Sequence, residues 1–354
     1  VAALTVVVPG RSSGAIVVPT CAFPIIVNQD DANVAYPDTN STYWAMPTNF
    51  SLGDVITISG QFAYARYMSF NTYDSTGSSV GGLHDVSILP DAGSVNPYLP
   101  GQSLQGTPRD YTVSVNVTNA PQVSSPVPGE IDAIPGPAWV LIRVYVPFDP
   151  ADPAGGVPLP SLTVNGVTKA GCTTFGPEPA IVALAAAIMG SAIADAVPPA
   201  EVPEFSFSGG GGLFPNADNK YVYATTSWAP GRLALVRGLA PTYPDTPGTG
   251  LYPQQQLRYW SMCTNLLVTP APVVECARDS DTVIDATGHY LYVIGAERDH
   301  PSAGSLQGAS ATWLPWFGPI TEALPDAAKP DGNLILRNML PAAGFANAVQ
   351  NIPV

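Results

Sequence analysis

The sequence repeats an ordered series of strand-like segments on either side of an Ala-rich stretch. Residues 65–70 read Ala-Arg-Tyr-Met-Ser-Phe, and residues 257–262 read Leu-Arg-Tyr-Trp-Ser-Met, which is the same order of residue types. A segment rich in Tyr, Thr and Trp lies upstream of each, at residues 40–45 and 223–229. A repeated order of segments predicts two tandem lobes related by internal duplication.

Four arginines set the spacing of this repeat. Arg66 and Arg258 lie in the matched segments, and each is followed by a second arginine within an apolar run that ends in Pro. The separation is 77 residues in the first half (143 − 66, to Arg143) and 79 residues in the second half (337 − 258, to Arg337). Order and spacing agree over about a hundred residues, which supports duplication rather than chance.

Short alternating segments with turn residues between them predict the fold class. In residues 55–60, Ile56 and Ile58 would share one face of a strand and Thr57 the other. The 354 residues include 33 Gly and 39 Pro, yet 46% are hydrophobic, so the chain is rich in turns but too apolar for a disordered protein. We expect a mainly β protein with two tandem antiparallel lobes, each a β-sandwich or jelly roll.

An Ala-rich run between Pro179 and Pro198 divides the two halves. A membrane span needs about 20 apolar residues, and this run is borderline in length, rich in small residues and carries Asp195. We expect a helix that joins the lobes instead of a membrane span. The predicted organisation is an N-terminal lead-in over residues 1–35, a first β lobe over 36–175, a helical linker and Gly-rich join over 176–212, and a second β lobe over 213–354.

The charge balance excludes several classes of partner. Thirteen Lys and Arg against 27 Asp and Glu give a net charge of −14. Phosphate backbones and anionic membranes repel such a surface, so we expect neither nucleic acid nor a membrane as a partner. A small-molecule or polymeric ligand and a homo-oligomer remain compatible with this composition.

The four cysteines predict the compartment. No Cys-x-x-Cys pair is present and the chain has three His, so a zinc or other transition-metal site is not expected. An even count is typical of two disulfides: Cys263 with Cys276 would close a hairpin-sized loop and leave Cys21 with Cys172, although four cysteines allow three connectivities. We therefore expect a secreted or cell-envelope protein of an oxidising compartment. The chain begins without Met, so any signal peptide is expected to have been removed.

Several short motifs resemble two known families. Residues 36–43 (Tyr-Pro-Asp-Thr-Asn-Ser-Thr-Tyr), followed by an Arg-Tyr strand at residues 66–67, are similar to the bacterial domain-of-unknown-function families twelve-fifty-four and twelve-fourteen. The second half adds Tyr-Trp-Ser at residues 259–261, Thr-Trp-Leu-Pro at 312–315 and Leu-Arg at 336–337. The resemblance covers most of the chain. It implies a β-rich, often exported protein and no agreed activity.

The arginine-bearing strands supply the candidate catalytic residues. Arg66 and Arg258 occupy equivalent strand positions, and an arginine inside an apolar strand needs a partner because an unpaired buried charge is costly. We expect Asp38 to be the partner of Arg66. The pairs are either a carboxylate- or carbonyl-binding site or structural ion pairs of the scaffold. The full set of candidate catalytic residues is Asp38, Arg66, Tyr67, Arg258, Tyr259 and His300, the last as a general base among carboxylates.

Aromatic and acidic clusters supply candidate binding residues. Exposed aromatic rings can form a platform for a sugar or lipid, so Tyr43, Trp44, Trp313 and Trp316 are candidate ligand-binding residues, with core packing as the alternative. No cofactor motif is present. Calcium is the one metal to consider, and its candidate ligands are Asp279, Asp281 and Asp285, although their spacing differs from that of an EF-hand.

Residues 77–81 (Gly-Ser-Ser-Val-Gly) match the pattern of a nucleophile elbow. A β-like segment and no helix follows, which favours a hairpin loop. His84 and Asp85 lie directly beyond the pattern and leave a serine hydrolase open.

The sequence therefore leaves three functions open, and whether the chain is an enzyme is uncertain. We expect an exported cell-envelope or extracellular β-sandwich protein that binds a small or polymeric ligand at a cleft between the lobes. The alternatives are an exported hydrolase or lyase that uses Arg, Tyr, Asp and His side chains in that cleft, and a self-assembling structural subunit.

Overall fold

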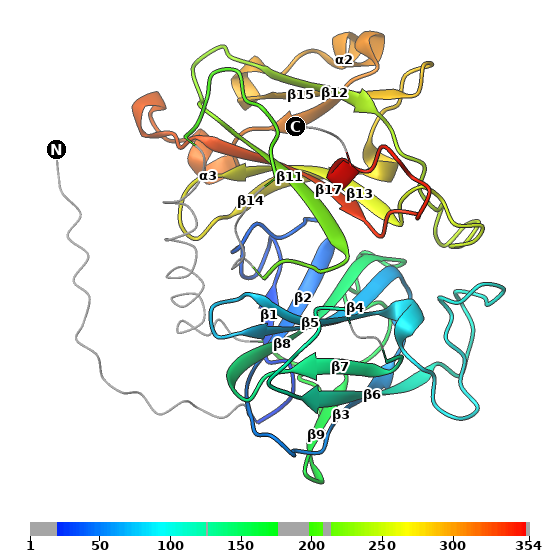
Figure 1. Cartoon of the computed structure of the whole chain (residues 1–354). Helices are drawn as coiled ribbons and strands as arrows, with labels where there is room; N and C mark the ends of the chain where they lie inside the picture. Colours follow the sequence, from blue (N-terminus) through cyan, green and yellow to red (C-terminus); the bar gives the residue numbers. More distant parts are fainter. Residues whose placement is uncertain (1–19, 125–126, 176–197, 208–213, 352–354) are drawn as a thin grey trace, which may run out of the picture.

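The chain forms two lobes that lie one above the other in Figure 1. This computed structural model describes residues 20–124, 127–175, 198–207 and 214–351. Strands β1 to β10 build the first lobe, and strands β11 to β17 build the second. The structure is mainly β, which confirms the predicted fold class.

The first lobe holds two five-stranded sheets. Its first sheet has the order β1-β2-β8-β4-β5, with bounds Ile25–Val27, Ser41–Phe50, Gly136–Pro147, Ala65–Asp74 and Ser79–His84. Its second sheet has the order β10-β9-β3-β6-β7, with bounds Val167–Lys169, Ser161–Val164, Ile56–Gln61, Asp110–Val117 and Glu130–Ala133. A single 3-10 turn, η1 (Asp85–Ser87), follows β5.

The second lobe holds a four-stranded and a three-stranded sheet. The first has the order β11-β17-β13-β14, with bounds Asn219–Thr226, Gly332–Met339, Tyr259–Leu266 and Val273–Arg278. The second has the order β12-β15-β16, with bounds Ala234–Leu239, His289–Gly295 and Thr312–Pro315. The helical turns are η2 (Asp279–Asp281), η3 (Glu297–Asp299), α2 (Ala303–Ala309), α3 (Pro319–Glu322), η4 (Asp326–Ala328) and η5 (Val349–Asn351).

Alternation along the strands places the core between the two sheets of a lobe. In β6, Tyr111, Val113 and Val115 are buried while the residues between them are exposed. The apolar cluster of the first lobe joins these side chains to Ile58 on β3 and Phe70 on β4, and so draws on both sheets. Each sheet therefore buries one face against the other, as a two-layer β fold requires.

The two lobes share a strand order. The series β2-β8-β4-β5 matches β11-β17-β13-β14, and the series β3-β6-β7 matches β12-β15-β16. The last pair in each second series, β6 with β7 and β15 with β16, is parallel, whereas the other pairs are antiparallel. The wholly antiparallel expectation misses these pairs, because the connections before β7 and β16 are long enough to return the chain to the start of the strand. The shared order is compatible with the predicted duplication.

Two disulfides are present, Cys21–Cys172 and Cys263–Cys276. Ala22 and Phe23 are buried in the first lobe and β1 pairs with β2, so the predicted lead-in over residues 1–35 includes part of that lobe. The Ala-rich run of the predicted linker lies outside the described residues. Among the helices that are described, none has the length and apolar character needed to cross a bilayer.

Candidate functional site

Two ion pairs cross the boundary between the lobes in opposite directions. Arg66 on β4 of the first lobe lies 2.6 Å (Nη1 to Oδ1) from Asp279, in η2 of the second lobe. Arg258, just before β13 of the second lobe, lies 3.2 Å (Nη1 to Oδ2) from Asp85, in η1 of the first lobe. Each lobe thus supplies one arginine and one carboxylate in matching positions, which is the pattern of a two-fold interface.

Backbone donors hold both carboxylates in the same way. Asp85 Oδ2 accepts a bond from the Met68 N–H at 3.2 Å, and Asp279 Oδ2 accepts one from the Trp260 N–H at 3.2 Å. Both carboxylates are fully buried. Since a buried charge needs a partner charge and hydrogen bonds, each carboxylate is satisfied jointly by its own lobe and by the other lobe.

The second pair of repeated arginines also reaches across the boundary. Arg143 Nη2 donates to the Phe214 carbonyl at 2.6 Å, and Arg337 Nη2 donates to the Tyr36 carbonyl at 2.7 Å. Phe214 and Tyr36 both have positive φ, 50° and 53°. Each carbonyl is therefore held in a left-handed conformation shortly before a matched strand, β11 or β2.

Two tyrosines next to the ion-paired arginines continue the pattern. Tyr67 OH donates to Asp218 Oδ2 at 2.6 Å, and Tyr259 OH donates to the Asp38 carboxylate at 2.9 Å. Burial, and then the charge of the adjacent carboxylate, raises the pKa of both tyrosines well above its ordinary value. Both hydroxyls therefore stay protonated and act as donors. With Tyr145 they form the apolar centre of the lobe interface.

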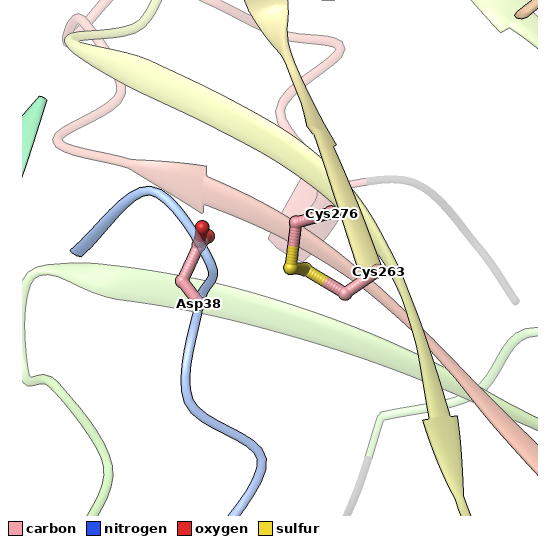
Figure 2. Close-up of side chains that lie close together, drawn as sticks. All are labelled: Asp38, Cys263 and Cys276. Carbon is pink, nitrogen blue, oxygen red and sulfur yellow. A yellow bond between two sulfur atoms is a disulfide. The ribbon is translucent and has the colours of Figure 1, made fainter. Parts of the chain in front are cut away.

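The two halves of this interface differ, because one of them contains a disulfide. Cys263 on β13 and Cys276 on β14 face each other directly, and Figure 2 shows the Asp38 carboxylate beside their sulfurs. In the described part of the chain these three residues are the only grouping with the spacing of metal ligands. Their sulfurs are bonded to each other, and Arg337 Nη1 lies 2.6 Å from Cys263 Sγ, so this half is a structural lock and not a metal centre.

The other half carries a histidine–carboxylate pair. His84 ends β5, and its Nδ1 lies 3.2 Å from Asp218 Oδ1, while Tyr67 holds the second oxygen of that carboxylate. The matched position in the second lobe, at the end of β14, is Arg278. His84 is 26% exposed and Asp218 15% exposed, so the pair is reachable from solvent, unlike the disulfide half.

The surroundings of His84 favour its charged form. Burial alone would lower the pKa of His84, but the hydrogen bond to Asp218 and the charges of Asp218 and Asp85 outweigh burial and raise that pKa. Burial would raise the pKa of Asp218, and its interactions with His84 and Tyr67 lower it instead. The pair is therefore imidazolium and carboxylate over the upper part of the acidic range, with Nε2 as the ring nitrogen left for a ligand.

A pocket of about 180 Å³ opens beside this pair, between the lobes. His84 and Arg258 are its two charged lining residues, and Tyr252, Gln254 and Gln255 add polar groups. Arg258 uses Nη1 for Asp85 and for the Arg66 carbonyl, and no residue in the described part of the chain bonds to its Nη2. The remaining lining residues are Val86, Pro244, Leu251, Leu257, Leu340 and Pro341.

This pocket can offer two charged donors to one acceptor. A carboxylate or carbonyl oxygen fits His84 Nε2 and Arg258 Nη2, since charge-assisted hydrogen bonds are the strong ones. The leucines and prolines of the lining would bury a small apolar group. The lining residues include no Ser, Thr, Cys or Lys, and among them His84 is the group that can act as an acid.

Five of the six predicted catalytic residues meet at the lobe boundary. Arg258 reaches the pocket, whereas Arg66, Tyr67, Tyr259 and Asp38 lie in the buried layer behind it. His300 does not join them. It is exposed, stacks on Trp313 at 4.5 Å between ring centroids, and precedes α2, which Figure 1 places on the side of the second lobe away from the first.

The expected pairing of Arg66 with Asp38 is wrong. Arg66 pairs with Asp279 instead, and Asp38 accepts bonds from Tyr259 and Ser261 and lies 3.8 Å from Arg337. The reason is geometric, because docking of the lobes brings the carboxylate of the second lobe to Arg66.

The predicted ligand-binding aromatics are mostly core residues. Trp44 and Trp316 are 1% and 2% exposed, so neither offers a surface to a ligand. Tyr43 is buried at the lobe interface, where its hydroxyl lies 2.9 Å from that of Tyr145. Trp313 is half-buried on the outer face of β16.

The predicted calcium ligands are separated by their own partners. Asp279 pairs with Arg66, Asp281 with Arg278, and Asp285 with Arg237. No arrangement of these three carboxylates around a common point occurs in the described residues.

The Gly-x-Ser-x-Gly match runs from the hairpin loop between β4 and β5 into β5, which confirms the favoured hairpin interpretation and not an elbow. Ser79 is the first residue of β5, and its hydroxyl donates to the Pro215 carbonyl at 3.3 Å. Gly81 is needed for packing, since a Cβ there would lie 2.4 Å from the Asp132 carbonyl oxygen.

Sequence reasoning missed Asp218, although a signal was present. Residues 215–221 read Pro-Asn-Ala-Asp-Asn-Lys-Tyr, and residues 37–43 read Pro-Asp-Thr-Asn-Ser-Thr-Tyr, with Pro and Tyr at the same spacing. Aligning these segments extends the repeat to the start of each lobe and sets Asp218 opposite Asn40. A carboxylate that replaces an amide at a repeated position marks the point where the two halves differ.

Two of the solved structures that match this chain are the following. An uncharacterised protein from Burkholderia cenocepacia has a TM-score of 0.52 and 13% sequence identity, over 88% of this chain and 76% of that chain. The VPA0106 protein from Vibrio parahaemolyticus has a TM-score of 0.45 and 10% identity, over 90% of this chain and 88% of that chain. No protein-family model matches the sequence, and no curated protein matches it. The first likeness shows a shared fold.

Proposed function

We propose that the chain is an exported protein that binds a small ligand in the pocket between its lobes. The observation that carries this proposal is the His84–Asp218 pair at the pocket wall, beside Arg258. The lining holds these charged donors together with apolar side chains such as Leu251 and Leu257, so the expected ligand joins a carboxylate or carbonyl group to a small apolar group.

Export and ancestry belong to the same proposal. The two disulfides support an oxidising compartment, because such bonds are rare in the cytosol. The shared strand order and the crossed ion pairs support descent of both lobes from one ancestral lobe. The relationship to the families twelve-fifty-four and twelve-fourteen rests on the motifs quoted above, among them residues 259–261 on β13.

The second candidate is an enzyme that uses the same pocket. The observation in its favour is the charged His84 held by Asp218, which is the arrangement of a general acid. A hydrolase or lyase of this kind would protonate a leaving oxygen of its substrate. In a hydrolase, water would attack the substrate directly, and in a lyase a bond within the substrate would break. The lining offers no hydroxyl or thiol nucleophile apart from the Tyr252 phenol.

The test follows the ring signal of His84 by NMR while butyrate and hexanoate are added to the whole protein, and measures each affinity by isothermal titration calorimetry. Butanol and hexanol are the uncharged comparison probes. We expect the acids to shift the His84 signal, hexanoate to bind more tightly than butyrate, and the alcohols to bind at least tenfold more weakly. In the calorimeter, His84→Gln should weaken hexanoate binding at least fivefold, whereas the exposed His300→Gln should bind as the unmodified protein does.

Two outcomes decide against the proposal. The binding proposal fails if none of the four probes shifts the His84 signal, or if His84→Gln binds hexanoate unchanged. The enzyme candidate predicts in addition that ethyl hexanoate and water give hexanoate and ethanol, and that His84→Gln abolishes this turnover. If the ester is stable in the presence of a protein that binds hexanoate, the chain is a binding protein.

A further inference from the structure

The outward faces of the second sheets differ between the two lobes. In the first lobe the strand residues on this face are polar, with Thr57 and Ser59 on β3 and Thr112 on β6, and the exposed Val55 lies just before β3. In the second lobe, Leu235 and Leu239 on β12 are 65% and 57% exposed. A solvated sheet face is normally polar, so the apolar face of the second lobe indicates a contact surface.

A glycine–tyrosine contact matches β12 with β3 residue by residue. A Cβ on Gly60 would lie 2.9 Å from the Tyr111 hydroxyl, and a Cβ on Gly238 would lie 2.3 Å from the Tyr290 hydroxyl. Both tyrosines lie on the neighbouring strand, directly opposite the glycine. Counting two residues back from each glycine sets Val236 of β12 in the position of Ile58.

The outer edge of β3 is covered, and the matching edge of β12 is not. Strand β9 pairs with β3 and sets Leu162 opposite Ile58, which is fully buried. Strand β12 ends its sheet, and in the described part of the chain no strand pairs with its outer edge. Val236, the counterpart of Ile58, is accordingly only half-buried.

The uncovered edge presents a row of backbone groups. The Ala240 N–H bonds to the Gly288 carbonyl, so the even-numbered residues of β12 direct their backbone groups toward β15. Leu235, Arg237 and Leu239 therefore direct theirs away from the sheet. An unpaired apolar edge of this kind is a template for another strand.

We propose that β12 pairs antiparallel with β12 of a second copy, about a two-fold axis at Val236. This joins two three-stranded sheets into one sheet of six strands. The first lobe shows what such an edge accepts, which is an antiparallel strand with an apolar residue opposite the Ile58 position. Val236 of the second copy supplies that residue, and it meets Val236 as Leu162 meets Ile58.

The charge of Arg237 favours this register of the pair over the neighbouring one. Centring the pair on Val236 sets Leu233 opposite Leu239 of the second copy and Arg237 opposite Leu235 of the second copy. Centring it on Arg237 would set two guanidinium groups directly opposite each other, which is destabilising. Arg237 is also the one charged residue of β12, so the net charge of −14 is not concentrated at this edge.

Sedimentation equilibrium of the whole chain, from low micromolar to several hundred micromolar concentration, tests the proposal. We expect a monomer–dimer equilibrium that Leu235→Lys/Leu239→Lys weakens at least tenfold. Both leucines are exposed, so this variant should keep the unfolding midpoint of the parent. Val55→Lys/Val167→Lys replaces two valines of the first lobe that are 71% and 68% exposed, and it should dimerise unchanged.

A single introduced cysteine tests the register. All four native cysteines are in disulfides, so the new thiol is the free one. Val236→Cys should give a disulfide-linked dimer under mild oxidation, because directly opposite strand residues are close enough to bridge. Ala234→Cys, on the same face and also half-buried, should not, because its opposite residue is Gly238 of the second copy. A parent that stays monomeric throughout, lysine variants that dimerise normally, or crosslinking through Ala234→Cys alone would each overturn the proposal.

Discussion

Arg66 and Asp279 form an ion pair of 2.6 Å that joins the two lobes, and the same contact recurs in the opposite direction between Arg258 and Asp85 at 3.2 Å. Crossed contacts of this kind are found where two equivalent surfaces face each other. The lobes therefore dock through matched groups, and the pocket between them lies where the match is broken by His84.

Removing one member of the Arg66–Asp279 pair should destabilise the whole protein. Asp279→Ala leaves the Arg66 guanidinium buried without its counter-charge, which typically costs about 3–5 kcal/mol. Replacing both charges, as in Arg66→Met/Asp279→Leu, should cost less than Asp279→Ala alone. Urea unfolding of each variant gives the comparison. Arg237→Ala breaks the exposed pair with Asp285 and should leave the midpoint nearly unchanged, and a similar loss in both single variants would refute the explanation.

The titration of His84 should be displaced to higher pH by its carboxylate neighbours. Its pKa is raised by Asp218 and Asp85, so its NMR ring signal should titrate at higher pH than an unperturbed histidine. Asp218→Asn removes the hydrogen-bonded charge and should bring that pKa down. A His84 signal that titrates at the ordinary value in the parent would contradict the pairing.

Stability should follow the protonation of the same pair. A raised pKa in the folded state means that His84 adds stability below its unfolded pKa of about 6.5, and that this part is lost as pH rises through the folded pKa. Asp218, whose pKa is lowered, adds stability above the ordinary carboxyl pKa of about 3.9, and that part is lost at lower pH. Urea unfolding across this range should show a fall on the alkaline side for the parent, and His84→Gln should lack it.

Gly81→Ala should destabilise the first lobe, while Ser79→Ala should not. A Cβ on Gly81 would lie 2.4 Å from the Asp132 carbonyl oxygen and 2.8 Å from Thr72 Oγ1, so β5 or β7 would have to shift. Overpacking of this kind costs about 1–3 kcal/mol. Gly344→Ala, where no atom lies within 4 Å of the added Cβ, is the matched control for urea unfolding. Equal midpoints for both glycine variants would show that β5 has room to move.

Loss of the Cys21–Cys172 disulfide should destabilise the folded chain strongly. The bond joins residues 151 positions apart, and closing so long a loop in the unfolded chain corresponds to about 5 kcal/mol in the chain-entropy estimate. Cys21→Ala/Cys172→Ala should therefore unfold at clearly lower urea concentration than the parent. The parent treated with a reductant under native conditions, with reduction verified by mass spectrometry, serves as the second measurement. An unchanged midpoint in both would show that the lead-in contributes little to the lobe.

Local sequence patterns were enough to predict the fold class, whereas contacts between residues far apart in the sequence were not predicted. The alternation around Ile56 and Ile58 predicts a half-buried strand, because side-chain direction in a strand depends on neighbouring residues alone. The partner of Arg66 was misassigned, because Asp279 belongs to the other lobe and meets Arg66 only across the lobe boundary. The parallel pairing of β7 with β6 was not predicted either, because the sequence of a loop does not show in which direction the next strand will pair.

The sequence predicted the arginines of the candidate site but not the His84–Asp218 pair. Repetition pointed to Arg66 and Arg258, and both lie at the lobe boundary. Asp218 has an amide, Asn40, at the matched position, so a search for residues shared by both halves passes over it. His84 was noticed for its place after a serine pattern, whereas its partner comes from a strand start more than a hundred residues later.

The crossed ion pairs make the evolution of one lobe depend on that of the other. Each of these arginines has its counter-charge in the opposite lobe, and it loses that counter-charge when the opposite lobe is deleted, unfolded or exchanged. Neither half could then be recruited alone into another protein, and unfolding should proceed in a single cooperative step. Mutations that alter one lobe's docking surface would survive only when the other lobe changed with it.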